Sequence, residues 1–209
     1  MQAEQWAHGS EIADLIEAGL VSDPGTARGR LLRAAAHLFS SRGFERTTVR
    51  DLAAEVGIQS GSIFHHFRSK DDILRAVMEE TIHYNLAQMR AALTGLSDPR
   101  QRLRALIRCE LQAINGESGE AMSVLVYEWR SLSEQGQELI LGLREVYESI
   151  WLEALQQAYD ARLVTVEPFI LRRLLTGALS WTITWYRPQG TLTLDELADQ
   201  TLKMLTNAG

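Results

Sequence analysis

The 209-residue chain has very little cysteine, no long apolar run and no basic residue near its start. Cys109 is the single cysteine, which excludes an internal disulfide and any metal site built from several thiolates. No stretch approaches the roughly 18 consecutive apolar residues of a membrane span. The first 25 residues contain no Lys or Arg, so they lack the basic region of a secretory signal. We therefore expect a cytoplasmic protein that makes no membrane contact.

Strand signals and catalytic motifs are also scarce. Apolar residues instead recur at helical spacing, as in Leu103, Leu106, Ile107 and Leu111. We predict an all-α fold. The chain has no Gly-rich phosphate loop and no His-Glu-x-x-His, Gly-x-Ser-x-Gly or Ser-x-x-Lys motif. A helical enzyme with scattered catalytic residues is the weaker alternative, and we predict that the protein is not an enzyme.

The positive charge is concentrated in one part of an acidic chain. The net charge is −6, yet residues 26–75 hold nine basic residues against five acidic ones. Residues 1–25 hold five acidic residues and no basic ones. A basic island of this kind favours contact with a polyanion at that place.

Helix starts carry recognisable capping signals. Asp98 precedes Pro99, a residue that suits the first helical position. A hydroxyl residue stands three positions before a carboxylate in four places: Thr48–Asp51, Ser69–Asp72, Ser131–Glu134 and Thr193–Glu196. With the apolar periodicity, these signals predict helices over residues 27–42, 48–55, 59–66, 70–94, 99–115, 119–131, 135–160, 166–186 and 194–206. We divide the chain into an N-terminal extension (1–25), a module of three short helices (26–68) and a larger helical domain (69–209).

The segment TTVRDLAAEVGIQSGSIFHHF, from Thr47 to Phe67, predicts two short helices that meet at Gly57. Glycine permits the left-handed backbone that so sharp a turn requires. The residues expected to share a small core are Leu52, Ala53, Val56, Ile58, Ile63 and Phe64. This layout is typical of a helix-turn-helix, whose second helix enters the major groove of DNA.

The adjacent His65 and His66 raise the alternative of a zinc site. Neighbouring helical residues point about 100° apart, so these two side chains cannot share one ion. We expect His65 to reach the DNA backbone and His66 to close the small core. We predict neither a metal site nor a cofactor.

Residues 30–77, RLLRAAAHLFSSRGFERTTVRDLAAEVGIQSGSIFHHFRSKDDILRAV, resemble the DNA-binding module of the TetR family of bacterial repressors. The resemblance implies an N-terminal three-helix helix-turn-helix module followed by a larger helical domain that binds a small effector and forms a homodimer. It also implies a transcriptional repressor that binds an inverted-repeat DNA operator and is released by its effector.

The family pattern places the DNA contacts within and beside the helix-turn-helix, about Thr48 to Phe67. The residues expected there are Thr47, Thr48, Gln59, Ser60, Gly61, Ser62, Ile63, His65 and Lys70. Gln59 can bridge two positions on adenine, and hydroxyl groups suit phosphate contacts. Phe64 stands where the family often has tyrosine, and Ser60 where it often has lysine. We therefore expect binding to depend less on charge than in more basic relatives.

The C-terminal part holds four of the five tryptophans: Trp129, Trp151, Trp181 and Trp185. From Phe169 to Trp185 the sequence is apolar on nearly every face, apart from Arg172 and Arg173, which predicts a helix buried on all sides. In a homodimer the partner subunit can cover one of those faces. The residues expected at the dimer interface are Leu175, Ala178, Trp185, Leu197 and Thr201.

The ending SWTITWYRPQG resembles TetR-family regulators of fatty-acid and steroid breakdown, several of which sense acyl-CoA thioesters. We therefore expect an acyl-CoA effector, with Arg172 or Arg173 on the CoA phosphates, because arginine suits phosphate recognition. The residues expected to bind the effector are Tyr127, Trp129, Arg130, Arg172, Arg173 and Trp181. Two alternatives remain open. These aromatic residues could be plain core, or the scaffold could be a multidrug-type sensor with buried acids such as Glu110, Glu128 or Glu153.

Overall fold

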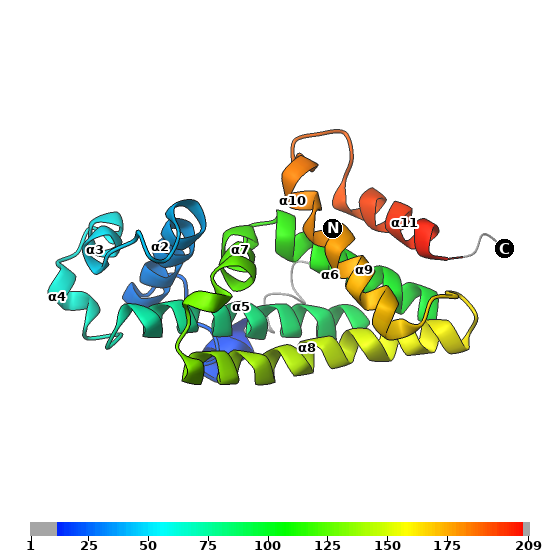
Figure 1. Ribbon diagram of the computed structural model, residues 1–209, viewed down its shortest axis with the longest axis horizontal. Helices are drawn as coiled ribbons and strands as arrows, with labels where there is room; N and C mark the ends of the chain where they lie inside the picture. The colour runs from blue at the N-terminus through cyan, green and yellow to red at the C-terminus, as the bar shows by residue number, and fades with distance from the viewer. Residues whose placement is uncertain (1–11, 207–209) are drawn as a thin grey trace. The chain divides into compact units, whose positions relative to one another are not determined.

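The computed structural model describes residues 12–206, and every regular element in this range is a helix (Figure 1). The all-α prediction is therefore confirmed. The chain forms two compact units, one containing residues up to Tyr84 with Glu120–Arg144, the other Asn85–Gly119 with Glu145–Gly209. Because residues 120–144 join the N-terminal residues, the compact units do not coincide with the domains predicted from the sequence.

The first unit is built around the three short helices near the N-terminus, drawn in blue and cyan in Figure 1. Residues 12–17 are also helical. The elements of this unit are α2 (Ala27–Arg42), α3 (Val49–Val56), α4 (Ser60–Ile63), the first part of α5 (Lys70–Leu93), α7 (Gly119–Tyr127), the 3-10 helix η1 (Trp129–Ser131) and the start of α8 (Glu134–Asp160). Leu31, Leu38, Phe39, Leu52 and Ile63 are almost fully buried and form the core of the module.

The second unit is arranged around α6 (Pro99–Asn115), which contacts three other helices of the unit. These are α9 (Pro168–Ser180), α10 (Thr182–Trp185) and α11 (Leu194–Leu205); the later parts of α5 and α8 complete the unit (Figure 1). Leu103, Leu106, Leu111, Trp151 and Leu155 are fully buried there. No helix within residues 12–206 combines the length and the apolar character that crossing a membrane requires.

Most helix starts follow the capping signals. Both capping boxes at Thr48 and Thr193 are complete, and Pro99 lies in the first turn of α6 behind the Asp98 cap. The Ser131 prediction is wrong. Helix α8 begins at Glu134, and the Ser133 hydroxyl accepts a hydrogen bond from the amide of Gly136 at 3.3 Å.

Three predicted helices are broken. The helix expected over 119–131 ends at Tyr127 and is followed by the 3-10 helix η1. The helix expected over 166–186 is divided into α9 and α10, with Trp181 between them. The second helix of the helix-turn-helix, expected over 59–66, is regular only from Ser60 to Ile63 and continues as a turn.

Candidate nucleic-acid interface and regulatory core

The helix-turn-helix is closed at Gly57, which ends α3 in the left-handed conformation (φ 71°, ψ 33°). The Gly57 prediction is confirmed. Leu52, Ala53 and Ile63 form the expected core, with exposed fractions of at most 3%. The prediction that Phe64 joins this core is wrong, because its side chain is 57% exposed.

The histidine assignment also needs correction. His65 and His66 are both exposed, so His66 does not close the small core. Phe67, one residue further along, fills that place with an exposed fraction of 6%, and the guanidinium of Arg28 lies 5.1 Å from the centre of its ring.

The nine residues predicted at DNA differ in accessibility. Thr48, Gln59, Gly61 and His65 are exposed, and Ser60, Ser62 and Lys70 are half-buried. The side chains of Thr47 and Ile63 are buried (0% and 1% exposed), so the expectation that they contact DNA is wrong for this conformation. The Thr47 hydroxyl donates to the carbonyl of Gly43 at 2.9 Å, which fixes the chain before α3.

Lys70 holds the same turn from another direction. Its ammonium donates to the carbonyls of Phe44 (2.8 Å) and Thr47 (3.0 Å) and lies 4.0 Å from the centre of the Phe44 ring. The side chain therefore positions the turn that precedes the helix-turn-helix. Its contact with phosphate stays a prediction.

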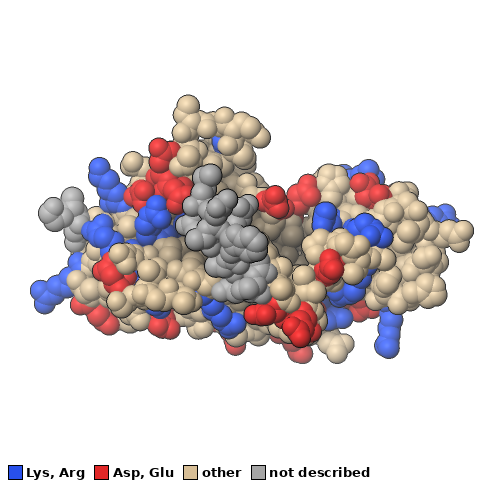
Figure 2. Space-filling view, turned by 180° about the vertical axis from the view of Figure 1, so that it is seen from behind, with Lys and Arg blue, Asp and Glu red and all other residues tan. Residues whose placement is uncertain are grey.

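Most arginines of the basic island, residues 26–75, are exposed to solvent. The predicted set of DNA-contacting residues contained none of these arginines. Figure 2 shows Lys and Arg side chains over the helix-turn-helix, with fewer acidic ones between them. The exposed arginines of this part are Arg30, Arg33, Arg42, Arg46, Arg50 and Arg68. The excess of positive charge in residues 26–75 was the sequence signal for them.

Helix α7 and the segment after it are tied to the helix-turn-helix module by carboxylates. Glu128 accepts the amide of Phe44 at 3.1 Å and the Ser131 hydroxyl at 2.8 Å. Asp71 accepts the amide and the hydroxyl of Ser133 at 3.0 and 2.9 Å. In the alternative of a multidrug-type sensor, Glu128 was one of the acids expected to face a cationic drug. Both of its carboxylate oxygens already accept hydrogen bonds from its own chain.

A third tie joins α2 to α7. The Nδ1 atom of His37 lies 2.8 Å from a carboxylate oxygen of Glu120. The hydrogen bond to Glu120, together with the charge of that carboxylate, raises the pKa of His37 above its usual value of 6.5.

The second unit contains a buried ionic cluster centred on Arg172 of α9. The Arg172 side chain is 2% exposed, 3.2 Å from Glu110 and 2.9 Å from Glu148, and its guanidinium lies 4.4 Å from the centre of the Trp151 ring. The Tyr147 hydroxyl donates to Glu110 at 3.1 Å. Burial raises the pKa of Tyr147 well above its usual range, and the negative charge of Glu110 adds to the rise.

This cluster changes the assignment of the two adjacent arginines. Burial lowers the pKa of Arg172, but the Glu110 and Glu148 carboxylates outweigh it and raise the pKa overall. Arg172 is inaccessible and already paired, so the expectation that it meets CoA phosphates is wrong for this conformation. Arg173 has a 59% exposed side chain and lies over Phe169, with the guanidinium 4.9 Å from the ring centre.

The six predicted effector residues are not gathered in one unit. Tyr127, Trp129 and Arg130 belong to the first compact unit, whereas Arg172, Arg173 and Trp181 belong to the second. Tyr127 and Trp181 are 71% and 67% exposed. An open hollow of about 560 Å³ in the second unit is lined by other residues: Tyr159, Asp160, Arg162, Val164 and Thr165.

The dimer interface stays a prediction, but burial within the chain separates the five residues that it named. Leu175, Leu197 and Thr201 are buried within their own chain, whereas Ala178 and Trp185 are exposed. The outward face of α9, which we call the α9 apolar face, carries Ile170 (50% exposed), Leu174 (64%), Ala178 and, just beyond the helix, Trp181. These side chains are exposed because only one side of α9 packs against its own unit.

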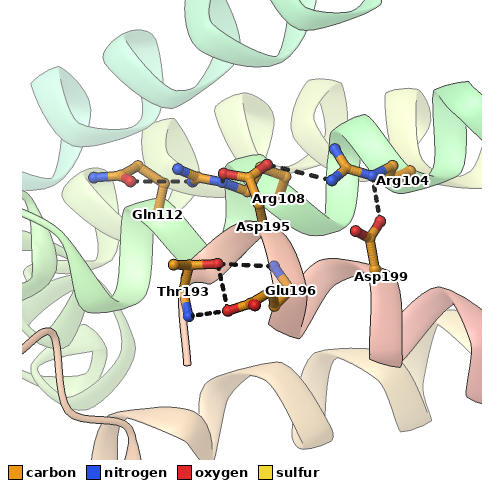
Figure 3. Close-up of polar contacts among 7 residues, drawn as sticks. All are labelled: Arg104, Arg108, Gln112, Thr193, Asp195, Glu196 and Asp199. Atoms are coloured by element: carbon orange, nitrogen blue, oxygen red, sulfur yellow. Dashed lines mark hydrogen bonds and ion pairs between the residues drawn. The ribbon is translucent and has the colours of Figure 1, made fainter. Parts of the chain in front are cut away.

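Ion pairs that the sequence analysis did not predict attach α11 to α6 (Figure 3). Arg104 pairs with Asp195 and Asp199, and Arg108 binds Asp195 at 3.1 Å and Gln112 at 3.0 Å. Leu197 and Thr201 of α11 are buried. The signal of the ion pairs in the sequence is weak, because the acids are about 90 residues away from the arginines.

Comparison with known proteins covers both parts of the chain. Residues 31–77 match the family described as bacterial regulatory proteins of the tetR family, and residues 96–208 match the tetracyclin repressor-like C-terminal domain. The HTH-type transcriptional repressor KstR2 of Rhodococcus jostii (strain RHA1) is 30% identical over 181 residues, which cover 85% of this chain and 88% of that protein.

Two solved structures show the same fold over nearly the whole length. A crystal structure described as superantigen pfit is 59% identical, covers 96% of this chain and 100% of that one, and has a TM-score of 0.84. AibR in complex with isovaleryl coenzyme A and operator DNA is 25% identical, covers 86% of this chain and 97% of that one, and has a TM-score of 0.77.

Proposed function

The chain belongs to the TetR family of bacterial regulatory proteins, and from this premise we propose that it is a repressor that binds an inverted-repeat operator as a homodimer and is released by an acyl-CoA thioester. The observation that carries the proposal is the helix-turn-helix itself. Gln59, Gly61 and His65 are exposed on or beside its second helix, where a major-groove reader needs its contacts. The arginines around it supply the charge for phosphates.

The homodimer is supported by the α9 apolar face. Large exposed apolar patches on a folded chain mark interaction surfaces, and Leu174 and Trp181 are both more than 60% exposed. A symmetric partner presents the same face in return, so that both patches become buried together. Two DNA-binding modules related in this way require an operator with two inverted half-sites.

The effector assignment is supported by relatives. AibR, similar to this chain over most of its length, was crystallised with isovaleryl coenzyme A and operator DNA. The buried Arg172 does not add support, since its charge is already paired with Glu110 and Glu148. An effector that binds better to the DNA-free conformation shifts the population away from the operator by that difference in affinity.

The test measures release of operator DNA from the protein. Fluorescence anisotropy monitors the release of a labelled duplex that the protein has selected from a random library. Acyl-CoA thioesters of different chain length, the matching free acids and CoA alone are added in turn. We expect a thioester to release the DNA below about 100 μM, with the free acid much weaker. If no thioester releases the DNA, or if the free acid is equally potent, the acyl-CoA assignment is contradicted. The proposal that the protein is a repressor is not affected by that outcome. Release by cationic dyes instead would favour the multidrug-type sensor.

A further inference from the structure

Phe64 is an apolar side chain displayed at the end of the recognition helix. It is the C-cap residue of α4, where the turn begins (φ −70°, ψ −7°), and its side chain is 57% exposed. Its neighbours Ile63 and Phe67 turn inward and are 1% and 6% exposed, so the small core is filled without it. A single exposed apolar residue is ordinary on a protein surface. This one differs by lying at the end of the second helix of the proposed DNA-binding module.

The surface beside Phe64 is bare. A long side chain on a helix leans towards the N-terminus, over the residues three and four positions earlier, which here are Gly61 and Ser60. Gly61 has no side chain, and a Cβ atom placed there would meet nothing within 4 Å. The phenyl ring therefore has open space towards the N-terminal half of the helix, where a helix-turn-helix reads base edges.

The chemistry of the ring selects its partner. A phenyl group neither donates nor accepts ordinary hydrogen bonds, so it cannot pair with phosphate or with the polar edges of the bases. The distinct apolar group on base edges in the major groove is the C5-methyl of thymine, which phenylalanine contacts in other DNA-binding proteins. Gln59, which is exposed at the N-cap of the same helix, can pair with an adenine.

We propose that Phe64 is a specificity-determining residue that contacts the C5-methyl group of one thymine in each operator half-site. The proposal rests on the proposed DNA-binding function. The ring favours thymine over cytosine, which lacks the methyl group, and over uracil. A contact of the ring with deoxyribose would strengthen binding to every sequence equally and makes a different prediction.

The experiment removes single methyl groups from the DNA. A duplex selected by the protein from a random library is resynthesised with each thymine in turn replaced by uracil, at equivalent positions of both half-sites. Deletion of one methyl contact is expected to weaken binding about four-fold per half-site, the factor that corresponds to about 0.8 kcal/mol per buried carbon group. Anisotropy gives the dissociation constants of the wild type, Phe64→Ala and His66→Ala, and the melting temperature verifies that each variant is folded.

We expect one uracil position to weaken DNA binding by the wild type and by His66→Ala by the same factor and to leave binding by Phe64→Ala unaffected. The proposal is overturned if no uracil substitution weakens the wild type, or if Phe64→Ala keeps the same methyl sensitivity. It is also overturned if Phe64→Ala weakens all duplexes equally, as a deoxyribose contact would. If the wild type selects no sequence at all, the proposed DNA-binding function fails first, and this inference fails with it.

Discussion

Replacement of Arg172 by methionine removes the only arginine of the buried cluster and leaves its two acids behind. Met is similar in length and fills much of the space, so the lost charge dominates the effect. Glu148 has a 28% exposed side chain and can turn towards water, but the Glu110 side chain is 5% exposed and cannot. The variant therefore holds an uncompensated carboxylate inside the second unit.

The expected cost follows from that burial. Breaking a buried ion pair by removing one partner costs about 3–5 kcal/mol. For a chain of this size, each kcal/mol lowers the melting temperature by about 2–4 °C, which gives a loss of about 6–20 °C. Arg173 is the matched control, because its side chain is 59% exposed and lies 3.9 Å from Glu148. An exposed pair of this kind contributes at most about 1 kcal/mol.

Thermal unfolding followed by far-UV circular dichroism measures both variants. We expect a large loss for Arg172→Met and little change for Arg173→Met. The double variant Arg172→Met/Glu110→Gln removes the uncompensated charge as well and should recover part of the lost stability. Equal melting temperatures for Arg172→Met and the wild type would refute the buried-charge reasoning. A large loss for Arg173→Met would show that the two side chains have been assigned the wrong way round.

Three further predictions concern the interface, the DNA contact and pH. Leu174→Glu should convert the dimer to a monomer in sedimentation experiments, and a dimer for this variant would place the interface elsewhere. Leu175→Ala should remain a dimer and lose about 2–5 kcal/mol of folding stability. Lys70→Ala should flatten the salt dependence of DNA binding by about one unit if the ammonium also contacts phosphate. An unchanged slope would show that Lys70 only positions the turn before the helix-turn-helix. NMR titration should give His37 a pKa above 6.5 that falls in Glu120→Gln. Because the folded pKa is raised, the stability from this pair is present below pH 6.5 and lost as pH rises through the folded value.

The sequence was sufficient for the fold class and for most helix ends. Capping residues and apolar spacing are local signals, and the Thr48 box, the Asp98–Pro99 start and the Gly57 turn all occur in the structure. The recognition helix was predicted too long because apolar spacing continues through Phe64 to Phe67 even though the backbone becomes a turn. Spacing alone does not distinguish a regular helix from such a turn.

The buried site could not be predicted, because its partners are far apart in the chain. Arg172 meets Glu148 and Glu110, which are 24 and 62 positions away. Arg172 and Arg173 look equivalent in the sequence, yet one is buried and the other exposed. The same limitation affected Leu174 and Leu175, since a helix that is apolar on nearly every face does not reveal which side meets its own chain.

The most direct test of the central claim is selection of DNA from a random-sequence library by the purified protein, followed by sequencing. A dimeric helix-turn-helix repressor predicts enrichment of an inverted repeat with two half-sites. The variant Gln59→Ala should relax the preference at one base position in each half-site. No enrichment, or enrichment of a single unrepeated site, would contradict the proposal that this protein binds its operator as a symmetric homodimer.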